Sequence, residues 1–172
     1  MPERVSAGLL MYRFSDGHLE VFLAHPGGPI FRRYDYGHWS IPKGSVQEGE
    51  QLLETAKREF KEEVGIEPQV EFLPLGRIRQ KGGRIVHAWA FPGDWKETQK
   101  HVCNTFTMEW PPRSGRFQSF PEIDRVGFFR LGAARDKLKE PASIFRPIAA
   151  GPAFQFRTTG SVGTTCQGRA AC

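Results

Sequence analysis

The sequence predicts a mixed α/β sandwich, in which helices pack against a β-sheet. Short apolar, β-prone runs lie on both sides of one strongly amphipathic helix, and further short helices are expected near the end. The chain has 172 residues and a hydrophobic share of 39%, which suits one domain with a sizeable core. We expect that domain over residues 1–156. The stretch 157–172 is rich in Gly, Ser and Thr and is expected to be a flexible tail.

The predicted strands follow the order of the chain. The first two are joined by the turn sequence SDG, and a Gly- and Pro-rich loop follows them over 26–39. A second hairpin has the turn sequence KGG, and a turn is expected at 111–115. The expected strands are 5–14, 19–26, 70–80, 84–91, 104–110 and 125–131. Two short helices are expected after them, at 132–140 and 142–149.

The central helix has an apolar stripe that predicts packing against a sheet. This stripe consists of Leu52, Leu53, Ala56, Phe60 and Val64, which cover an arc of roughly 120° on a helical wheel. Gly65 follows at the position of a left-handed terminating residue, and the later proline at position 68 prevents continuation.

Three acidic residues of this helix are crowded beside the stripe. Glu59, Glu62 and Glu63 cover an arc of roughly 100°, and like charges at such spacing weaken an isolated helix by roughly 0.2–0.5 kcal/mol per pair. A bound hard cation such as Mg²⁺ would remove this repulsion, because it takes oxygen ligands. The alternative is an ordinary charged face exposed to solvent.

A longer pattern surrounds these acids. Its fixed positions are Gly44, Glu50, Arg58-Glu59-Phe60, Glu62-Glu63, Gly65 and Ile66. The pattern resembles the Nudix box, which reads Gly, five residues, Glu, seven residues, Arg-Glu-apolar-any-Glu-Glu-any-Gly-apolar. Every fixed position is present, and Phe60 stands where the family more often has an aliphatic residue. The resemblance covers about residues 4–148 and is nearest to bacterial hydrolases of diadenosine polyphosphates and small nucleotides.

The resemblance implies a Nudix-type α/β/α sandwich with a mixed sheet and one catalytic helix. It also implies that Glu59, Glu62 and Glu63 bind Mg²⁺, or Mn²⁺ in its place, together with the carbonyl oxygen of Gly44. Of these, Glu62 and Glu63 are expected to act in catalysis. Arg58 is included among the catalytic residues as a charge-assisted clamp on the loop or the glutamates. Glu50 is expected to support the site from the loop.

A general base is expected outside the helix. In related hydrolases a glutamate precedes the closing aromatic strand by a few residues, and Glu122 stands six residues before Phe128. Glu109 is the alternative, because a strand could direct it toward the same cleft. We favour Glu122.

Positive charge and aromatic residues cluster before the box. Lys43, Arg32 and Arg33 are predicted to bind phosphate groups, and Tyr36 is predicted to contact the base. Trp39 could either stack on a base or pack in the core.

The expected function is Mg²⁺-dependent hydrolysis of a phosphoanhydride bond in a nucleoside diphosphate linked to another group, with dinucleoside polyphosphates as favoured substrates. Alternatives are the hydrolysis of damaged nucleoside triphosphates or nucleotide sugars, the removal of pyrophosphate from RNA 5′ ends, and nucleotide sensing without cleavage. The net charge of +5 suits an anionic partner. The sequence contains no apolar run that is long enough to span a membrane, so no membrane partner is expected. Three cysteines without metal spacing favour a reduced, cytoplasmic protein. The oligomeric state is not predicted.

Overall fold

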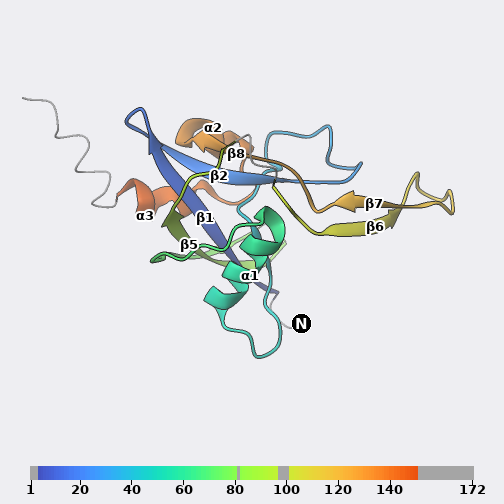
Figure 1. Ribbon diagram of the computed structural model, residues 1–172, viewed down its shortest axis with the longest axis horizontal. Helices are drawn as coiled ribbons and strands as arrows, with labels where there is room; N and C mark the ends of the chain where they lie inside the picture. The colour runs from blue at the N-terminus through green and yellow to red at the C-terminus, as the bar shows by residue number, and fades with distance from the viewer. Residues whose placement is uncertain (1–3, 81, 97–100, 151–172) are drawn as a thin grey trace, which may run out of the picture.

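The computed structural model describes residues 4–80, 82–96 and 101–150, and the predicted tail at 157–172 lies outside them. Its centre is a mixed sheet with the strand order β4-β5-β1-β2-β8, and β3 pairs with β1 beside this path (Figure 1). The strands of this sheet are β1 (Val5–Ser15), β2 (His18–Pro26), β3 (Lys43–Ser45), β4 (Leu73–Arg79), β5 (Ile85–Pro92) and β8 (Ile123–Arg130).

The sheet is mixed because β1 runs parallel to β5 and antiparallel to β2 and β3. Both predicted hairpins are confirmed, since β1 pairs with β2 and β4 pairs with β5 in antiparallel registers. β8, which contains the predicted aromatic closing strand, pairs antiparallel with β2 at one edge of the sheet.

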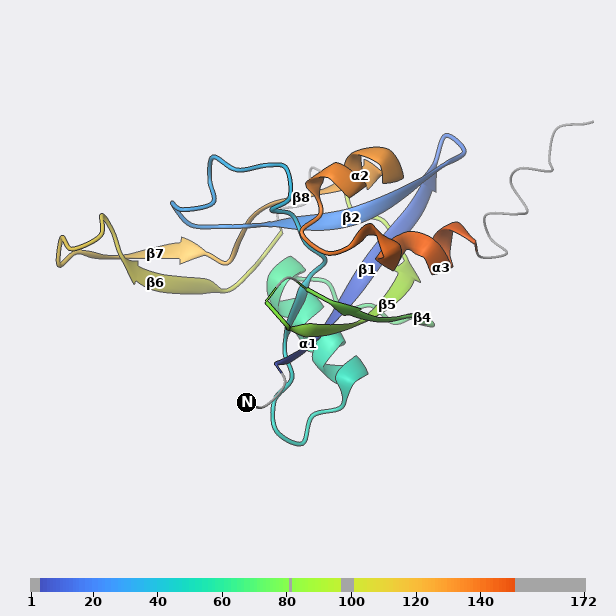
Figure 2. The same ribbon diagram turned by 180° about the vertical axis from the view of Figure 1, so that it is seen from behind.

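Helices cover both faces of the sheet. On one side lies α1 (Leu52–Val64), and on the other lie α2 (Leu131–Lys137), the 3₁₀ helix η1 (Ala142–Phe145) and α3 (Arg146–Ala149) (Figures 1 and 2). Alternate side chains of β1 divide between the two layers: Leu9 and Met11 pack beneath α1, and Leu10 packs on the opposite side. This arrangement is the predicted α/β/α sandwich.

The central helix follows its predicted stripe. Ala56, Phe60 and Val64 are buried, and the two leucines before them pack at the edge of the same core. Gly65 has φ 83°, and its N–H donates to the carbonyl of Lys61, so the helix ends where the sequence indicates.

Two strands were missed by the sequence analysis. β3 contains only three residues, which is too short for a recognisable strand pattern, and it forms a strand because it pairs with β1. β7 (Phe117–Pro121) pairs with β6 (Thr105–Glu109) in a separate two-stranded hairpin. This hairpin extends from the body of the protein beside the loop that follows β2 (Figures 1 and 2). In the part of the chain that the structure describes, no helix is both long and apolar enough to cross a membrane.

Candidate active site

The acidic side of α1 faces the short strand β3. The backbone N–H of Lys43 donates to Glu63 Oε2 over 3.2 Å. Gly44 lies directly against Glu59, because a Cβ atom built on Gly44 would be only 2.0 Å from the Glu59 carboxyl carbon. Glycine at this position therefore leaves the space that the Glu59 carboxylate occupies.

Arg58 connects the helix to the loop that precedes it. Its guanidinium donates two hydrogen bonds to Glu50, from Nε over 2.9 Å and from Nη2 over 3.0 Å. Nη1 donates to Glu59 over 2.8 Å and to Glu62 over 3.2 Å. These bonds give Arg58 the contacts of a clamp on both the loop and the glutamates. Its inclusion among the catalytic residues stays a prediction.

Burial raises the pKa of some acids in this cluster, whereas a neighbouring positive charge lowers the pKa of another. Desolvation raises the pKa of Glu63 to about 8 and raises the pKa of Glu59 above its ordinary value. Hydrogen bonds from Arg58 instead lower the pKa of Glu50 to about 2. The helix therefore carries two acids that would ionise more readily beside a bound cation.

Glu122 lies in the electrostatic range of this cluster. It is exposed, and its negative charge contributes to the raised pKa of both Glu59 and Glu63. Glu109 lies elsewhere, in the β6–β7 hairpin, where its Oε1 accepts a hydrogen bond from the N–H of Gly115 over 2.6 Å. The structure thus brings Glu122 and not Glu109 toward the acidic helix. The role of Glu122 as base stays a prediction.

The donor set suits a hard divalent cation by its chemistry. It combines the carboxylates of Glu59, Glu62 and Glu63 with the close backbone approach at Gly44. In the described ranges, no group of three or more His, Cys, Asp or Glu side chains already has metal-binding geometry. Arg58 instead holds the carboxylates of two of these glutamates. Arg58 Nη1 bonds Glu59 through Oε1 and Glu62 through Oε2, so the second oxygen of each carboxylate is not used by Arg58 and would be the one to meet the cation.

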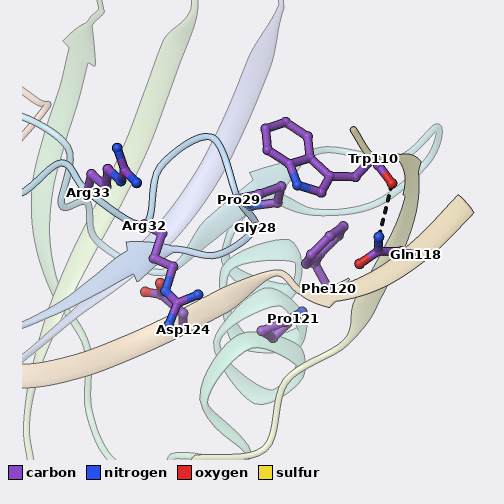
Figure 3. A pocket seen from close by; sticks show the side chains of 9 residues that line it. All are labelled: Gly28, Pro29, Arg32, Arg33, Trp110, Gln118, Phe120, Pro121 and Asp124. Carbon is purple, nitrogen blue, oxygen red and sulfur yellow. Dashed lines mark hydrogen bonds between the residues drawn. The ribbon is translucent and has the colours of Figure 1, made fainter. Parts of the chain in front are cut away.

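A cavity of about 660 Å³ opens between the loop after β2 and the β6–β7 hairpin (Figure 3). Two of the predicted phosphate-binding residues, Arg32 and Arg33, line it. The rest of its lining consists of Gly28, Pro29, Trp110, Gln118, Phe120, Pro121 and Asp124. Pro121 and Asp124 line the cavity and flank the segment that contains Glu122, so the backbone leads from the cavity wall directly to the predicted base.

Lys43 and Tyr36 are not brought to this cavity. The ammonium of Lys43 pairs over 2.9 Å with Glu140, whose side chain is fully buried. Tyr36 is 71% exposed, and its ring lies 5.4 Å from the ammonium of Lys137. Trp39 is buried in the core, and its indole N–H donates to Asp35 over 2.6 Å. Of its two predicted roles, the structure therefore shows packing in the core rather than an exposed ring that could stack on a base.

Sequence reasoning missed Trp110 and Phe120 in the cavity and Glu140 behind Lys43. Trp110 and Phe120 belong to a hairpin that the sequence only half predicts, so their common face could not be recognised. Glu140 follows Lys139 at the end of the expected helix 132–140, and nothing in the sequence marks it as buried.

Comparison with known proteins gives the family. The model of the NUDIX domain matches residues 2–147. No curated protein sequence matches the chain.

Several solved structures share the fold. An Ap4A hydrolase from C. elegans in a binary complex has 23% sequence identity and a TM-score of 0.58, and the match covers 84% of this chain and 96% of that one. The NUDIX domain of Shewanella oneidensis NrtR, complexed with ADP ribose, has 15% identity and a TM-score of 0.56, with 86% and 85% covered. The dihydroneopterin triphosphate pyrophosphohydrolase of E. coli has 16% identity and a TM-score of 0.56, with 88% and 100% covered. The chain belongs to the NUDIX domain family of pyrophosphohydrolases, which act on phosphoanhydride bonds.

Proposed function

We propose that the protein hydrolyses a phosphoanhydride bond in a nucleoside diphosphate linked to another group, with Mg²⁺ as its cation. Dinucleoside polyphosphates such as diadenosine tetraphosphate are the proposed substrates. The observation that carries the proposal is the link between Glu122 and the acidic helix: the N–H of Glu122 donates over 2.9 Å to the carbonyl of Asn104, whose own N–H donates over 3.3 Å to the carbonyl of Glu62. Two arginines line the cavity whose wall directly precedes Glu122 in the chain.

The similar structures support this ligand class. One is an Ap4A hydrolase, one hydrolyses dihydroneopterin triphosphate, and one binds ADP ribose. All three compounds contain linked phosphates, and the proposed substrate shares that feature. A dinucleoside polyphosphate also offers a second nucleotide group, for which the 660 Å³ cavity provides room.

Each residue of the cluster has a separate task in the proposed reaction. Glu59, Glu62 and Glu63 would hold the divalent cation, which neutralises the charge of the diphosphate and activates water. Arg58 fixes the orientation of the carboxylates around it through its bonds to the loop and the helix. The N–H of Lys43 fixes one oxygen of Glu63.

Glu122 would receive the proton of the attacking water. The water oxygen forms a bond to phosphorus while a bridging P–O bond breaks, and the leaving fragment keeps the bridging oxygen and its charge. Glu122 suits this task because it is exposed to solvent at the edge of the cluster. Arg32 and Arg33 line the cavity and would bind the charged phosphates of the nucleotide fragment.

A substrate panel tests this function. The protein is incubated with diadenosine tetraphosphate, ADP-ribose, a nucleotide sugar, oxidised nucleoside triphosphates and a 5′-triphosphorylated RNA oligonucleotide, with Mg²⁺ or with EDTA. Products are identified by mass spectrometry. Cleavage of diadenosine tetraphosphate that requires Mg²⁺ is the expected result. Tight binding without turnover of any compound would contradict the proposal and indicate a nucleotide sensor.

The Glu62→Gln variant tests the acidic helix. Because cation binding supplies several kcal/mol of transition-state stabilisation, we expect kcat to fall about 10²–10⁴-fold. Glu54→Gln is the matched control, since Glu54 lies on the same helix but its side chain is 60% exposed and pairs with Lys57. Equal activity of the two variants would refute the assignment.

The Glu122→Gln variant tests the base. We expect kcat to fall about 10²–10⁴-fold while calorimetry still records Mg²⁺ binding. Glu109→Gln serves as the control from the neighbouring hairpin and should retain full activity. Unchanged turnover in Glu122→Gln would move the role to another residue.

A further inference from the structure

The cavity beside the β6–β7 hairpin has two chemically different ends. Trp110 and Phe120 lie at one end, and Arg32 and Arg33 lie at the other, together with Asp124 (Figure 3). A ligand that fills both ends needs a flat apolar part and an anionic part. A nucleoside 5′-phosphate has these two parts, and its size suits a cavity of about 660 Å³.

The aromatic end is held in place by contacts within the hairpin. The backbone N–H of Trp110 donates to the carbonyl of Arg116 over 2.8 Å, and the side-chain amide of Gln118 donates to the carbonyl of Trp110 over 2.9 Å. Phe120 packs against Phe106, with ring centroids 6.1 Å apart. These bonds fix the backbone from which the Trp110 ring projects, and Phe106 supports the Phe120 ring, so part of the order that stacking needs is present before a base binds.

The hairpin also contacts the opposite wall closely. A Cβ atom on Gly28 would be 2.9 Å from the ring of Phe106, and Gly28 has φ 86°, so this approach requires glycine. The N–H of Gly27 donates over 2.8 Å to the carbonyl of Glu122. The two walls of the cavity are therefore joined directly beside the proposed base.

The charged end carries excess positive charge. Arg32 and Arg33 are both exposed and line the cavity. The nearby carboxylate of Asp124 is already engaged, since it accepts a hydrogen bond over 2.6 Å from Nδ1 of the buried His25. An anionic group is thus the complement of this end.

We propose that this cavity binds a nucleoside 5′-phosphate part of the substrate, with the base stacked on Trp110 and Phe120 and the phosphate at Arg32 and Arg33. The inference rests on the proposed function, because it assigns the cavity to the nucleotide whose phosphate chain reaches the acidic helix. It makes the hairpin, rather than the helix, the determinant of nucleotide affinity.

The test measures binding apart from catalysis. The affinity of the full chain for AMP is measured by calorimetry in EDTA, where no hydrolysis is expected. The Trp110→Ala variant should bind AMP about 5- to 150-fold more weakly, because it loses one stacking side chain. Trp110→Phe should recover most of this affinity, because it keeps an aromatic face. Recovery would separate stacking from damage to the hairpin.

Phe117→Ala is the matched control. Phe117 lies on the same hairpin but is 71% exposed and does not line the cavity, whereas Gln118 and Phe120 do. We expect this variant to bind AMP like the wild type. Equal losses in Phe117→Ala and Trp110→Ala, or no loss in either, would overturn the proposal.

The phosphate end has its own readout. Replacing Arg32 and Arg33 together by glutamine should reduce the affinity for AMP to that for adenosine, and should leave adenosine binding unchanged. An unchanged preference of this variant for AMP over adenosine would overturn the assignment of the arginines.

Failure of this inference is distinguishable from failure of the proposed function. Hydrolysis by the wild type combined with unaltered AMP binding in Trp110→Ala would refute the cavity assignment alone. AMP binding that depends on Trp110, without hydrolysis of any panel compound, would refute the hydrolase function and support the cavity.

Discussion

Replacing Glu140 by glutamine is expected to destabilise the protein by about 3 kcal/mol, the lower end of the cost of breaking a buried ion pair. The Glu140 side chain is fully buried, and the Lys43 side chain is only 13% exposed. The glutamine can still accept the hydrogen bond that Gln80 donates over 2.9 Å to Glu140 Oε1. The change therefore keeps the oxygen that Gln80 and Lys43 both contact, and removes mainly the buried negative charge that faces the Lys43 ammonium.

The magnitude gives measurable shifts. With a urea m-value of about 2 kcal/mol per M, a loss of about 3 kcal/mol moves the unfolding midpoint by about 1.5 M. For a protein of this size the same loss lowers Tm by about 6–12 °C. Both are measured by circular dichroism at neutral pH. A loss below about 1 kcal/mol, the value typical of a surface pair, would refute the reasoning.

Two further variants make this result specific. Glu67→Gln breaks the Lys61–Glu67 pair, in which the side chains are 59% and 57% exposed, and should change stability little. The double replacement of Lys43 and Glu140 by methionine should recover most of the stability lost in either single variant, because no unpaired charge stays buried. Additive losses in the double variant would show that the two residues do not depend on each other.

Three other predictions follow from individual contacts. Gly44→Ala should displace the Glu59 carboxylate from the space that it occupies, so calorimetry should record weaker Mg²⁺ binding, and unchanged affinity would contradict the predicted ligand set. Asp35 has a lowered pKa, chiefly through the hydrogen bond from Lys137, so its contribution to stability is present above its ordinary pKa of 3.8 and is lost as the pH falls through its lower folded value. Urea unfolding of Asp35→Asn should therefore show a shallower loss of stability below about pH 4 than the wild type, and equal slopes would refute it. Phe60→Ala should lower the free energy of unfolding, measured in urea, by about 3–5 kcal/mol, because the ring is fully buried between α1 and the sheet. A loss below about 1 kcal/mol would contradict this, because it would mean that neighbouring side chains fill the space left by the ring.

The parts of the structure that were predictable are those encoded by local patterns. The stripe of Ala56, Phe60 and Val64 sufficed for the helix and its buried face, because a helix repeats every 3.6 residues. The closeness of Glu59 to Glu62 followed from the same period. Apolar, β-prone runs joined by the turn sequences SDG and KGG likewise indicated the two main hairpins.

The parts that could not be predicted depend on contacts between distant segments. The partner of Lys43 is a residue 97 positions later in the chain, at Glu140, and no local pattern connects the two. Trp110 and Phe120 share a cavity only because β6 pairs with β7 in one particular register. Tyr36 carried a plausible aromatic signal, but the loop directs it to solvent beside Lys137.

The β6–β7 hairpin continues directly into Glu122, whereas α1 contributes nothing to the walls of the cavity. In the proposed roles, the ligand preference and the hydrolytic machinery occupy separable stretches of the polypeptide. Changes in the length or composition of the segment between β6 and β7 could then diversify the nucleotides that are accepted, without altering the spacing of the acids on the helix. An engineered exchange of this hairpin between relatives is a direct route to altered specificity.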